Sequence, residues 1–171
     1  MDFFQVVSQR RSVRAFQHRE VEPEKLKRIL ETANMAPSAG DLQAYRIYAV
    51  KSQQARIGLA RAALGQSFIA EAPVVLVFCA VPMWSAVKYG RRGERLYSLQ
   101  DATIACAYAQ LAATALGLGS TWVGAFDEHS VSQAIGASDE EVPIAILPIG
   151  YPAESPMPTP RRRLSELVRE K

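Results

Sequence analysis

The fold is decided by residues 100–118, which have the sequence QDATIACAYAQLAATALGL. Alanine is the commonest residue in this stretch, and Asp101 is its only charged residue. A helix that is apolar nearly all round is normally buried, so we predict a long buried central helix. Its small side chains would also let a second helix pack closely. The stretch could therefore be the core of one chain, the interface between two copies, or core on one face and interface on the other.

The chain on both sides of this helix contains short apolar runs and amphipathic segments. The apolar runs predict strands, and periodic segments that begin with a capping residue or an early proline predict helices. We expect strands at 46–50, 73–81, 121–126 and 143–150, and further helices at 2–10, 22–36, 52–64 and 127–136. Because these elements mix without strict β-α-β alternation, the predicted fold class is α+β, with a mixed central β-sheet flanked by helices.

Two segments fall outside these regular elements. Residues 84–99 are polar and basic, and we expect a mobile excursion there. Residues 148–160 contain five prolines, which favour an extended arm, and a short helix or turn is expected from Leu164 onward. No internal repeat and no linker interrupts the sequence, so residues 1–171 are expected to form a single domain.

The composition is that of an ordinary globular protein, with 49% hydrophobic and 22% charged residues. Cys79 and Cys106 each lie in an apolar run, so buried reduced thiols are expected, although the sequence does not exclude a disulfide between them. The N-terminus lacks the pattern of a signal peptide, and the longest apolar run, residues 73–83, is too short to cross a bilayer. We therefore expect a cytoplasmic protein that does not enter a membrane.

Several common kinds of site have no counterpart in this sequence. Neither His18 nor His129 has a cysteine or carboxylate at metal-ligand spacing, so no metal site is expected. There is no Gly-x-Ser-x-Gly elbow and no phosphate-loop motif. Residues 117–119, Gly-Leu-Gly, follow a predicted helix, which indicates a helix C-cap rather than a dinucleotide-binding loop. The net charge of +3 comes from arginine clusters without interleaved aromatic residues, so nucleic-acid binding is not expected.

Residues 10–14, Arg-Arg-Ser-Val-Arg, are the first candidate ligand-binding segment. In an extended segment, alternation sends the side chains of Arg10, Ser12 and Arg14 to one side. Guanidinium groups suit a phosphate because their donors fork to two oxygens, and a serine adds a neutral donor. The alternative is a solvated basic stretch without a ligand.

Two further segments contain residues that suit a ligand. Residues 37–43, PSAGDLQ, combine a fixed φ, a small hydroxyl, a permissive glycine and hydrogen-bonding side chains, so their backbone can approach a flat ligand closely. Residues 161–163 are three consecutive arginines after the proline-rich arm, which can reach back to the domain. Taken alone, the first segment could be an ordinary turn and the second an exposed basic tail.

In this order along the chain, these segments resemble the nitroreductase family of FMN enzymes. The resemblance covers nearly the whole chain, and its specificity lies in the ordered set of motifs. The motifs are RRSVR at 10–14, ANMAPS at 33–38, Ala-Pro at 72–73, YSLQD at 97–101, GLGSTWVGAF at 117–126 and PIGYP at 148–152. The resemblance implies a nitroreductase-like fold and an FMN-binding domain whose flavin lies between the two copies of a homodimer.

The resemblance assigns the FMN phosphate and ribityl chain to the two arginine-rich segments. The residues implied are Arg10, Ser12, Arg14, Arg161 and Arg163. Arg11 would donate through its backbone or point toward the ring. Arg161 and Arg163 are favoured over Arg162 because alternation in an extended arm would aim them together.

The resemblance assigns the isoalloxazine ring to other parts of the chain. The ring contacts from the partner subunit would come from Pro37, Ser38, Ala39, Asp41 and Gln43. Val123 and Gly124 would lie near flavin N5 and O4, where a backbone N–H can donate to the ring, and Gln66 is a weaker candidate for its pyrimidine edge. The family usually has Asn at the position of Asp41. An ionised carboxylate accepts but does not donate, so Asp41 would either lower the flavin potential or pair with an arginine.

The implied activity is the transfer of electrons from a reduced nicotinamide to a small acceptor. NADH or NADPH would pass a hydride to flavin N5, and a nitroaromatic, quinone, flavin or enone would then be reduced in a ping-pong cycle without a catalytic side chain. The alternatives are an FMN-binding sensor or storage protein without turnover, a dehalogenase or flavin-cleaving enzyme on the same scaffold, and an anion- or nucleic-acid-binding module. The sequence identifies neither the acceptor nor the preferred nicotinamide.

Overall fold

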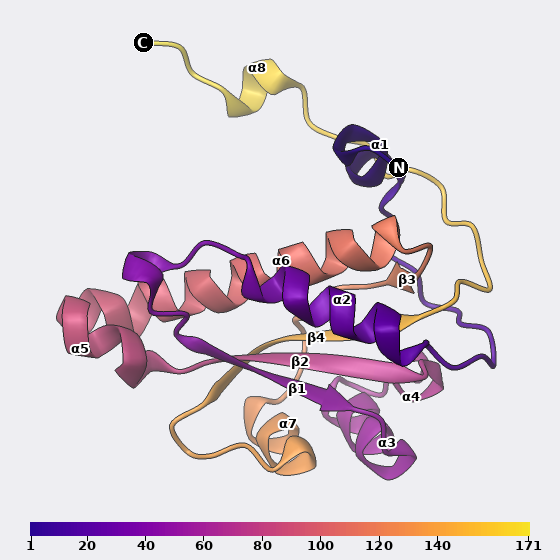
Figure 1. The fold of residues 1–171 in the computed structure, drawn as a ribbon, viewed down its shortest axis with the longest axis horizontal. Coiled ribbons are helices and arrows are strands. Elements are labelled where there is room, and N and C mark those ends of the chain that lie inside the picture. The colour runs from indigo at the N-terminus through magenta and orange to yellow at the C-terminus, as the bar shows by residue number, and fades with distance from the viewer.

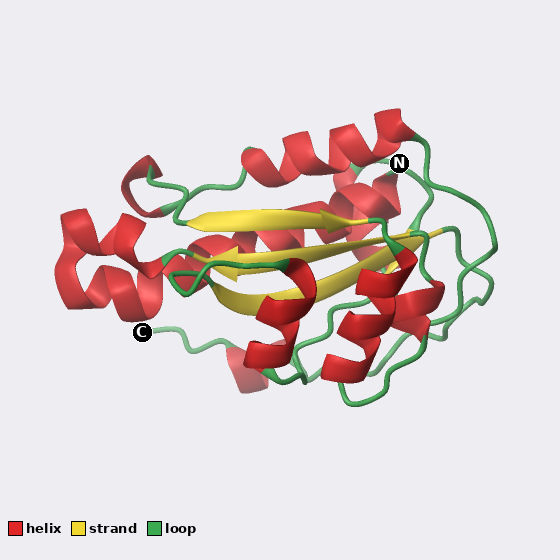
Figure 2. Ribbon diagram, turned by 90° about the horizontal axis from the view of Figure 1, so that it is seen from below, coloured by secondary structure: helices red, strands yellow, loops and turns green.

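The computed structural model describes residues 1–171 and has a four-stranded sheet between two layers of helices (Figure 1). Helices α2 and α6 cover one face, and α3, α4 and α7 cover the other (Figure 2). The strands are β1 Tyr45–Val50, β2 Val74–Ala80, β3 Gly119–Ser120 and β4 Val142–Gly150, in the spatial order β1-β2-β4-β3. The helices of the two layers are α2 Pro23–Asn34, α3 Gln53–Ala62, α4 Phe68–Glu71, α6 Ser98–Ala115 and α7 Glu128–Ile135. The predicted α+β class is confirmed.

Strand β2 lies inside the sheet and is buried along its whole length. Successive side chains of a strand point to opposite faces. Leu76 and Phe78 therefore belong to the core beneath α2 and α6, whereas Val75 and Val77 belong to the core on the other face. Burial on both faces explains why this run is continuously apolar rather than alternating.

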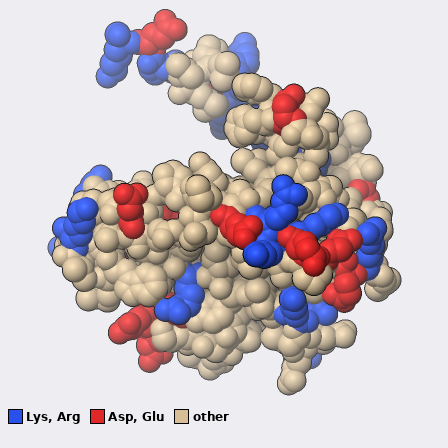
Figure 3. Space-filling model, in the orientation of Figure 1, with Lys and Arg blue, Asp and Glu red and all other residues tan.

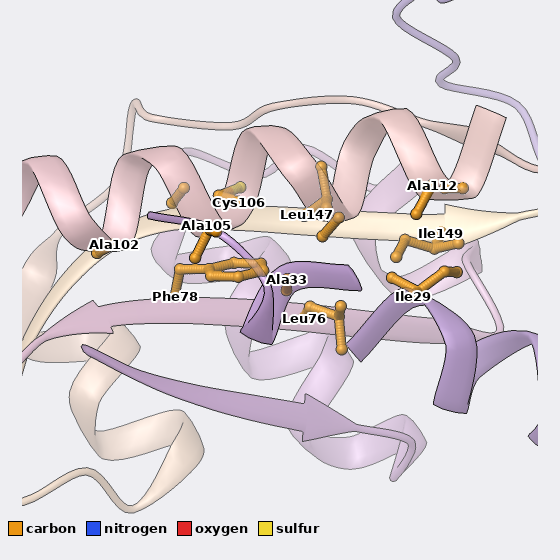
Figure 4. Packing of buried hydrophobic residues seen from close by; sticks show 14 of the residues in the cluster. Ile29, Ala33, Leu76, Phe78, Ala102, Ala105, Cys106, Ala112, Leu147 and Ile149 are labelled. Carbon is orange, nitrogen blue, oxygen red and sulfur yellow. The ribbon is translucent and has the colours of Figure 1, made fainter. Parts of the chain in front are cut away.

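Helix α6 is the long alanine-rich helix that the sequence predicts. Its side chains Ala105 and Ala109 are fully buried against the sheet, and Figure 4 shows the small residues of α6 facing Phe78 and Ile149. Tyr108, on the flank of the helix, is 37% exposed, and Gln100 and Thr103 on the side away from the sheet are also exposed. Within one chain, α6 is therefore core on one face, and its other face is partly open to solvent.

The sheet is antiparallel in all three strand pairs, β1 with β2, β2 with β4 and β3 with β4. Its parallel component is limited to an isolated bridge between Ser12 and Ser120. The expected mixed sheet is corrected to this extent: β2 and β3 run in the same direction, but β4 lies between them, so every pair of neighbouring strands is antiparallel. The expected strand at 121–126 is also replaced, by β3 and a single later bridge between Val123 and Ile146.

Two predicted helix starts are confirmed by their caps. Helix α1 (Phe3–Gln9) begins with a capping box in which Asp2 accepts from the Gln5 backbone at 2.9 Å and the Gln5 side chain accepts from the Asp2 backbone at 3.0 Å. Helix α7 begins at Asp127, which accepts from the Ser130 backbone at 2.8 Å. These bonds satisfy amides that have no partner inside the helix.

The expected mobile excursion at 84–99 is wrong. The chain forms α5 (Pro82–Arg92), breaks at Gly90, where φ is 53°, and continues through a π-helical turn (Gly93–Tyr97) into α6. The turn packs back on α5, because Gly93 lies against the Ser85 backbone and the Tyr97 ring meets the Tyr89 ring edge-on at 5.1 Å. Polar and basic residues on its outer surface hide this packing in the sequence.

The proline-rich arm after β4 is extended, as predicted. It runs past α1 and ends in the short helix α8 (Leu164–Leu167), which stands off the body of the molecule (Figure 1, Figure 3). All residues from 157 to 171 are exposed in the single chain. The arm is therefore held in position by contacts at its base, which are described below.

Both cysteines are buried and unpaired, as expected. Burial raises the pKa of both thiols, that of Cys79 to about 12. None of the helices combines the length and apolarity that a membrane span requires.

The packing of the turn against α5 predicts the effect of Gly93→Ala. A Cβ at residue 93 would lie 2.7 Å from the Ser85 carbonyl carbon, so α5 would have to shift. We expect a loss of about 1–3 kcal/mol in the free energy of unfolding, measured with urea. Val87→Ala, at a side chain of α5 that is 88% exposed, should change stability by less than about 0.5 kcal/mol. Equal stabilities of the two variants would contradict the packed hairpin.

Candidate functional site

An open cavity of about 350 Å³ brings together residues from both ends of the chain. One wall is the segment after α1, and the other is the arm. The polar lining residues are Ser8, Arg10, Arg11, Ser12, Arg14, Thr159 and Arg161. The structure thus places four of the five predicted phosphate residues, all but Arg163, together with Arg11 in one cavity.

Backbone pairing with β3 fixes the basic segment in place. The Val13 amide donates to the Ser120 carbonyl at 3.0 Å, and Ser12 forms the parallel bridge to Ser120. Gly119 permits this approach, since a Cβ there would lie 2.9 Å from the Val13 side chain. Val13 is buried, whereas Arg14 is exposed, so alternation along the extended segment directs Arg10 and Arg14 away from the core.

The base of the arm is bonded to the same segment. The Glu154 carboxylate accepts from the backbone amides of Arg14 and Ala15, the latter at 3.1 Å. The Ala153 amide donates to the Ala15 carbonyl at 2.9 Å, and the Gln17 amide donates to the Tyr151 carbonyl at 2.9 Å. These bonds hold the two walls of the cavity together.

The guanidinium charges in this cavity are uncompensated by any ion pair, since the neighbouring Glu154 carboxylate binds backbone amides instead. No carboxylate forms an ion pair with Arg10, Arg11, Arg14 or Arg161, since the ion pairs of the structure lie elsewhere. Burial lowers the pKa of the Arg10 guanidinium, and the positive charges of Arg161 and Arg11 lower it further. Such a set of forked donors suits a phosphate group, whose negative charge would relieve the repulsion. The residues present therefore fit the phosphate end of FMN.

The second predicted segment is a tightly wound loop between α2 and β1. Residues Ala39–Asp41 form a 3₁₀ turn, and three residues have left-handed backbones: Gly40 (φ 59°), Asp41 (φ 58°) and Gln43 (φ 46°). The Ser38 hydroxyl accepts from the Gln43 amide at 3.0 Å. Non-glycine residues with positive φ are uncommon and are strained by about 1–3 kcal/mol each. The surrounding structure must therefore hold the loop in this shape.

This loop also lies against α5. A Cβ on Gly40 would meet the Tyr89 hydroxyl and would lie 2.7 Å from the Lys88 Nζ. Glycine is favoured here by its positive φ, whereas the atoms nearest to a Cβ are the ends of two flexible side chains, which can move aside. Asp41 is exposed, and no ion pair to a neighbouring cation forms in the single chain.

The loop and the arginine cavity lie at opposite ends of α6 (Figure 1). The loop bonds to Asp101 near the start of this helix, whereas Thr114 near its end lines a hollow shared with Arg11. These thirteen residues of helix correspond to about 20 Å. Within one chain, the residues predicted for the phosphate and those predicted for the ring are therefore not brought together.

The remaining predicted ring residues lie on the α3 and α7 side of the sheet. Val123 is buried in the same core as Val13, and its amide donates to the Ile146 carbonyl at 2.9 Å. Gly124 is exposed, and its amide has no backbone acceptor, so it is the donor that remains available. The Gln66 side chain donates to the Ala63 carbonyl at 2.9 Å.

Arg163 does not line the cavity with Arg161. Its guanidinium pairs with Glu166 at 3.4 Å, and its backbone amide donates to the same carboxylate at 3.2 Å. The expected alternation stops here because α8 begins at the next residue and turns the chain. The structure thus groups Arg161, but not Arg163, with the basic segment.

Sequence reasoning missed two carboxylates that bind backbone amides around these residues. Glu154 is exposed and lies among prolines, so nothing in the sequence marks it. Asp101 is 2% exposed and accepts from the Ala39 and Ala44 amides. Its position as the only charge in an apolar helix was the signal that could have identified it.

The family model for the nitroreductase family matches residues 7–67 and 58–151. The chain belongs to the nitroreductase family. It is 32% identical to the NADH dehydrogenase of Thermus thermophilus over an alignment 186 positions long, gaps included, which covers 93% of this chain and 91% of that protein. It is 28% identical over 166 residues to an FMN reductase (NAD(P)H) of Bacillus subtilis, covering 88% of this chain and 66% of that protein.

A solved structure confirms the nitroreductase fold. The nitroreductase family protein of Streptococcus pneumoniae superposes with a TM-score of 0.90, covering 99% of this chain and 100% of that chain. Its sequence is 21% identical, so this likeness concerns the fold alone.

The uncompensated cavity predicts that inorganic phosphate stabilises the protein when no other ligand is bound. Phosphate should raise Tm more than chloride at equal ionic strength, measured by differential scanning fluorimetry. Arg10→Gln should not lower Tm without phosphate, because it removes a repelled charge, and it should reduce the phosphate-induced rise.

The matched control is Arg91→Gln, which removes an exposed arginine of α5 at the other end of the molecule. This variant should retain the full response. An Arg10→Gln protein with the wild-type response would show that the anion binds elsewhere.

Proposed function

We propose that this chain is an FMN-dependent oxidoreductase that takes reducing equivalents from NADH or NADPH and passes them to a small acceptor. The observation behind this proposal is the cavity in which Arg10, Arg11, Arg14 and Arg161 have no carboxylate partner. Family membership and the similarity to an FMN reductase support the same activity.

The arginines and Ser12 would hold the phosphate and ribityl chain of FMN. Guanidinium donors would orient the phosphate, and the uncovered Gly124 amide would be free to donate to the ring. Arg163 would contribute only if the arm moved. Bound FMN would supply the chemistry, accepting a hydride from the nicotinamide at N5 and reducing the acceptor in a ping-pong cycle. The side chains then need only bind, orient and exclude water.

A second copy of the chain would complete the site. The loop at 37–43 lies about 20 Å along α6 from the cavity of its own chain, and α6 leaves a partly open face around Tyr108. Pairing two copies through this face would bring one copy's loop to the other's cavity. Pro37, Ser38, Ala39, Asp41 and Gln43 would then contact the isoalloxazine. We therefore propose a homodimer with FMN at its interface.

The acceptor class includes nitroaromatics, quinones, free flavins and enones, all of which are flat and can stack on a flavin. We also propose a single domain and a cytoplasmic location, where reduced nicotinamides are available. Nucleic acid is not a proposed partner, since the arginines of the cavity converge on one small hollow instead of forming an extended track.

The first test is the visible absorption spectrum of the purified protein. We expect flavin absorption that NADH or NADPH bleaches under anaerobic conditions. Arg10→Gln and Arg14→Gln should each raise the Kd for FMN by about 10–150-fold, because one charge-assisted contact contributes about 1.5–3 kcal/mol. Arg91→Gln should leave the Kd unchanged.

The outcomes distinguish the proposed activity from the alternatives. Bound flavin that neither nicotinamide bleaches would indicate a sensor or storage protein. A colourless protein that cannot be loaded with FMN would overturn the proposal.

A site shared between copies predicts complementation between two inactive variants. Gln43→Pro cannot adopt the positive φ at this position and loses the amide bonded to Ser38, so it should disable the loop. Arg10→Gln/Arg14→Gln should disable the cavity. Co-expressed under separate tags, the heterodimer should regain one working site of two, measured as bound FMN and NAD(P)H oxidation. No recovery in an isolated heterodimer would show that loop and cavity act within one chain.

A further inference from the structure

The loop at 37–43 is held in a strained shape, and its amide donors show what holds it. The Asp41 amide donates to the Ser38 carbonyl at 3.2 Å, and the Leu42 amide to the Ala39 carbonyl at 3.3 Å. The Gln43 amide donates to the Ser38 hydroxyl. These bonds are internal to the loop and do not connect it to the rest of the protein.

Two kinds of bond anchor the loop to the rest of the protein. The Gln43 side chain donates to the carbonyl and side-chain oxygens of Asn34 on α2, both at 3.0 Å, and two backbone amides donate to one carboxylate on α6. Asp101 Oδ1 accepts from the Ala39 amide at 3.0 Å, and Asp101 Oδ2 accepts from the Ala44 amide at 3.2 Å. These two amides bracket the left-handed residues Gly40, Asp41 and Gln43. Each oxygen of Asp101 is therefore committed to one end of the strained stretch.

The chemistry of this contact requires a carboxylate. Both neighbours are N–H donors, so both side-chain atoms facing them must accept. Asparagine has the same shape, but its NH₂ group would face one of the two donors. Asp101 is 2% exposed, so water cannot replace the lost bond. The only charge in an otherwise apolar helix is thereby explained.

We propose that Asp101 is a positioning residue that holds the 38–44 loop in its ligand-binding conformation. This inference rests on the proposed function, in which the loop meets the flavin ring while the arginines hold the phosphate. Asp101 acts through the backbone of the loop and does not touch the cofactor. Replacing Asp101 should therefore affect only one of the two parts of the site: it should weaken binding of the ring and leave the arginine cavity intact.

The test compares Asp101→Asn with Ser98→Ala, which removes another buried polar group from the same helix. Ser98 is fully buried and bonds only the Glu94 carbonyl, away from the loop. Hydrogen exchange of the flavin-free proteins should be about tenfold faster or more at residues 38–44 in Asp101→Asn, and unchanged there in Ser98→Ala. The Kd for FMN should rise by about tenfold or more in Asp101→Asn, and the rise in Tm with inorganic phosphate should stay at the wild-type value. A general loss of structure would reduce both responses.

A second variant removes the same hydrogen bond from the loop side. Ala39 is the first residue of the 3₁₀ turn, and Ser38 before it is extended (φ −136°, ψ 158°), so proline fits the backbone there. Ala39→Pro deletes the amide bonded to Asp101 without changing α6. It should reproduce the faster exchange at residues 40–44. If Asp101→Asn does not fold, this variant alone tests whether the bond to Asp101 holds the loop.

The outcomes separate this inference from the proposed function. A folded Asp101→Asn protein with wild-type exchange in the loop would overturn the inference. So would an equal loss of the FMN and phosphate responses. Wild-type protein that binds no FMN would overturn the proposed function, and exchange in the flavin-free proteins would still decide whether Asp101 holds the loop.

Discussion

The structure depends on the close packing of α6 against the sheet. Alanines along one face of this helix let it lie directly on β2 and β4, where larger side chains would hold it away. The same helix fixes both parts of the candidate site, since the loop bonds to its first turn and β3 follows its last turn. Site geometry is thus a consequence of core packing, and enlarging an alanine here would displace both parts.

Hydrophobic periodicity predicted most of the fold. The caps at Asp2 and Asp127 and the doubly buried strand at 73–81 follow local rules, and the structure confirms them. Residues 84–99 were mispredicted because their packing is internal to a small hairpin, and the many charged residues on its outer surface resemble a solvated loop. The sequence also did not predict the strand directions, because these depend on long-range pairing. Val74, for example, pairs with Ile149, and no local pattern specifies this partner.

The candidate site, like the fold, was predicted only in part from the sequence. Arginine chemistry and alternation identified the segment at 10–14, and Arg161, which the family resemblance also named, lines the same cavity from the far end of the chain. Arg163 lies apart from them in the single chain, because α8 begins at the next residue and the Arg163 guanidinium pairs with Glu166. Glu154 and Asp101 were missed because each binds backbone amides, and a side chain's backbone partners depend on the folded path rather than on residue type.

The bond between Glu154 and the Arg14 amide joins residues 140 positions apart. Contacts of such separation form late, because the entropy lost on closing a long loop is recovered only after the intervening core has assembled. During synthesis, the arginines near the N-terminus would leave the ribosome long before the wall that completes their hollow. Binding of a phosphate in this cavity would then indicate that the intervening polypeptide has been made and is correctly folded.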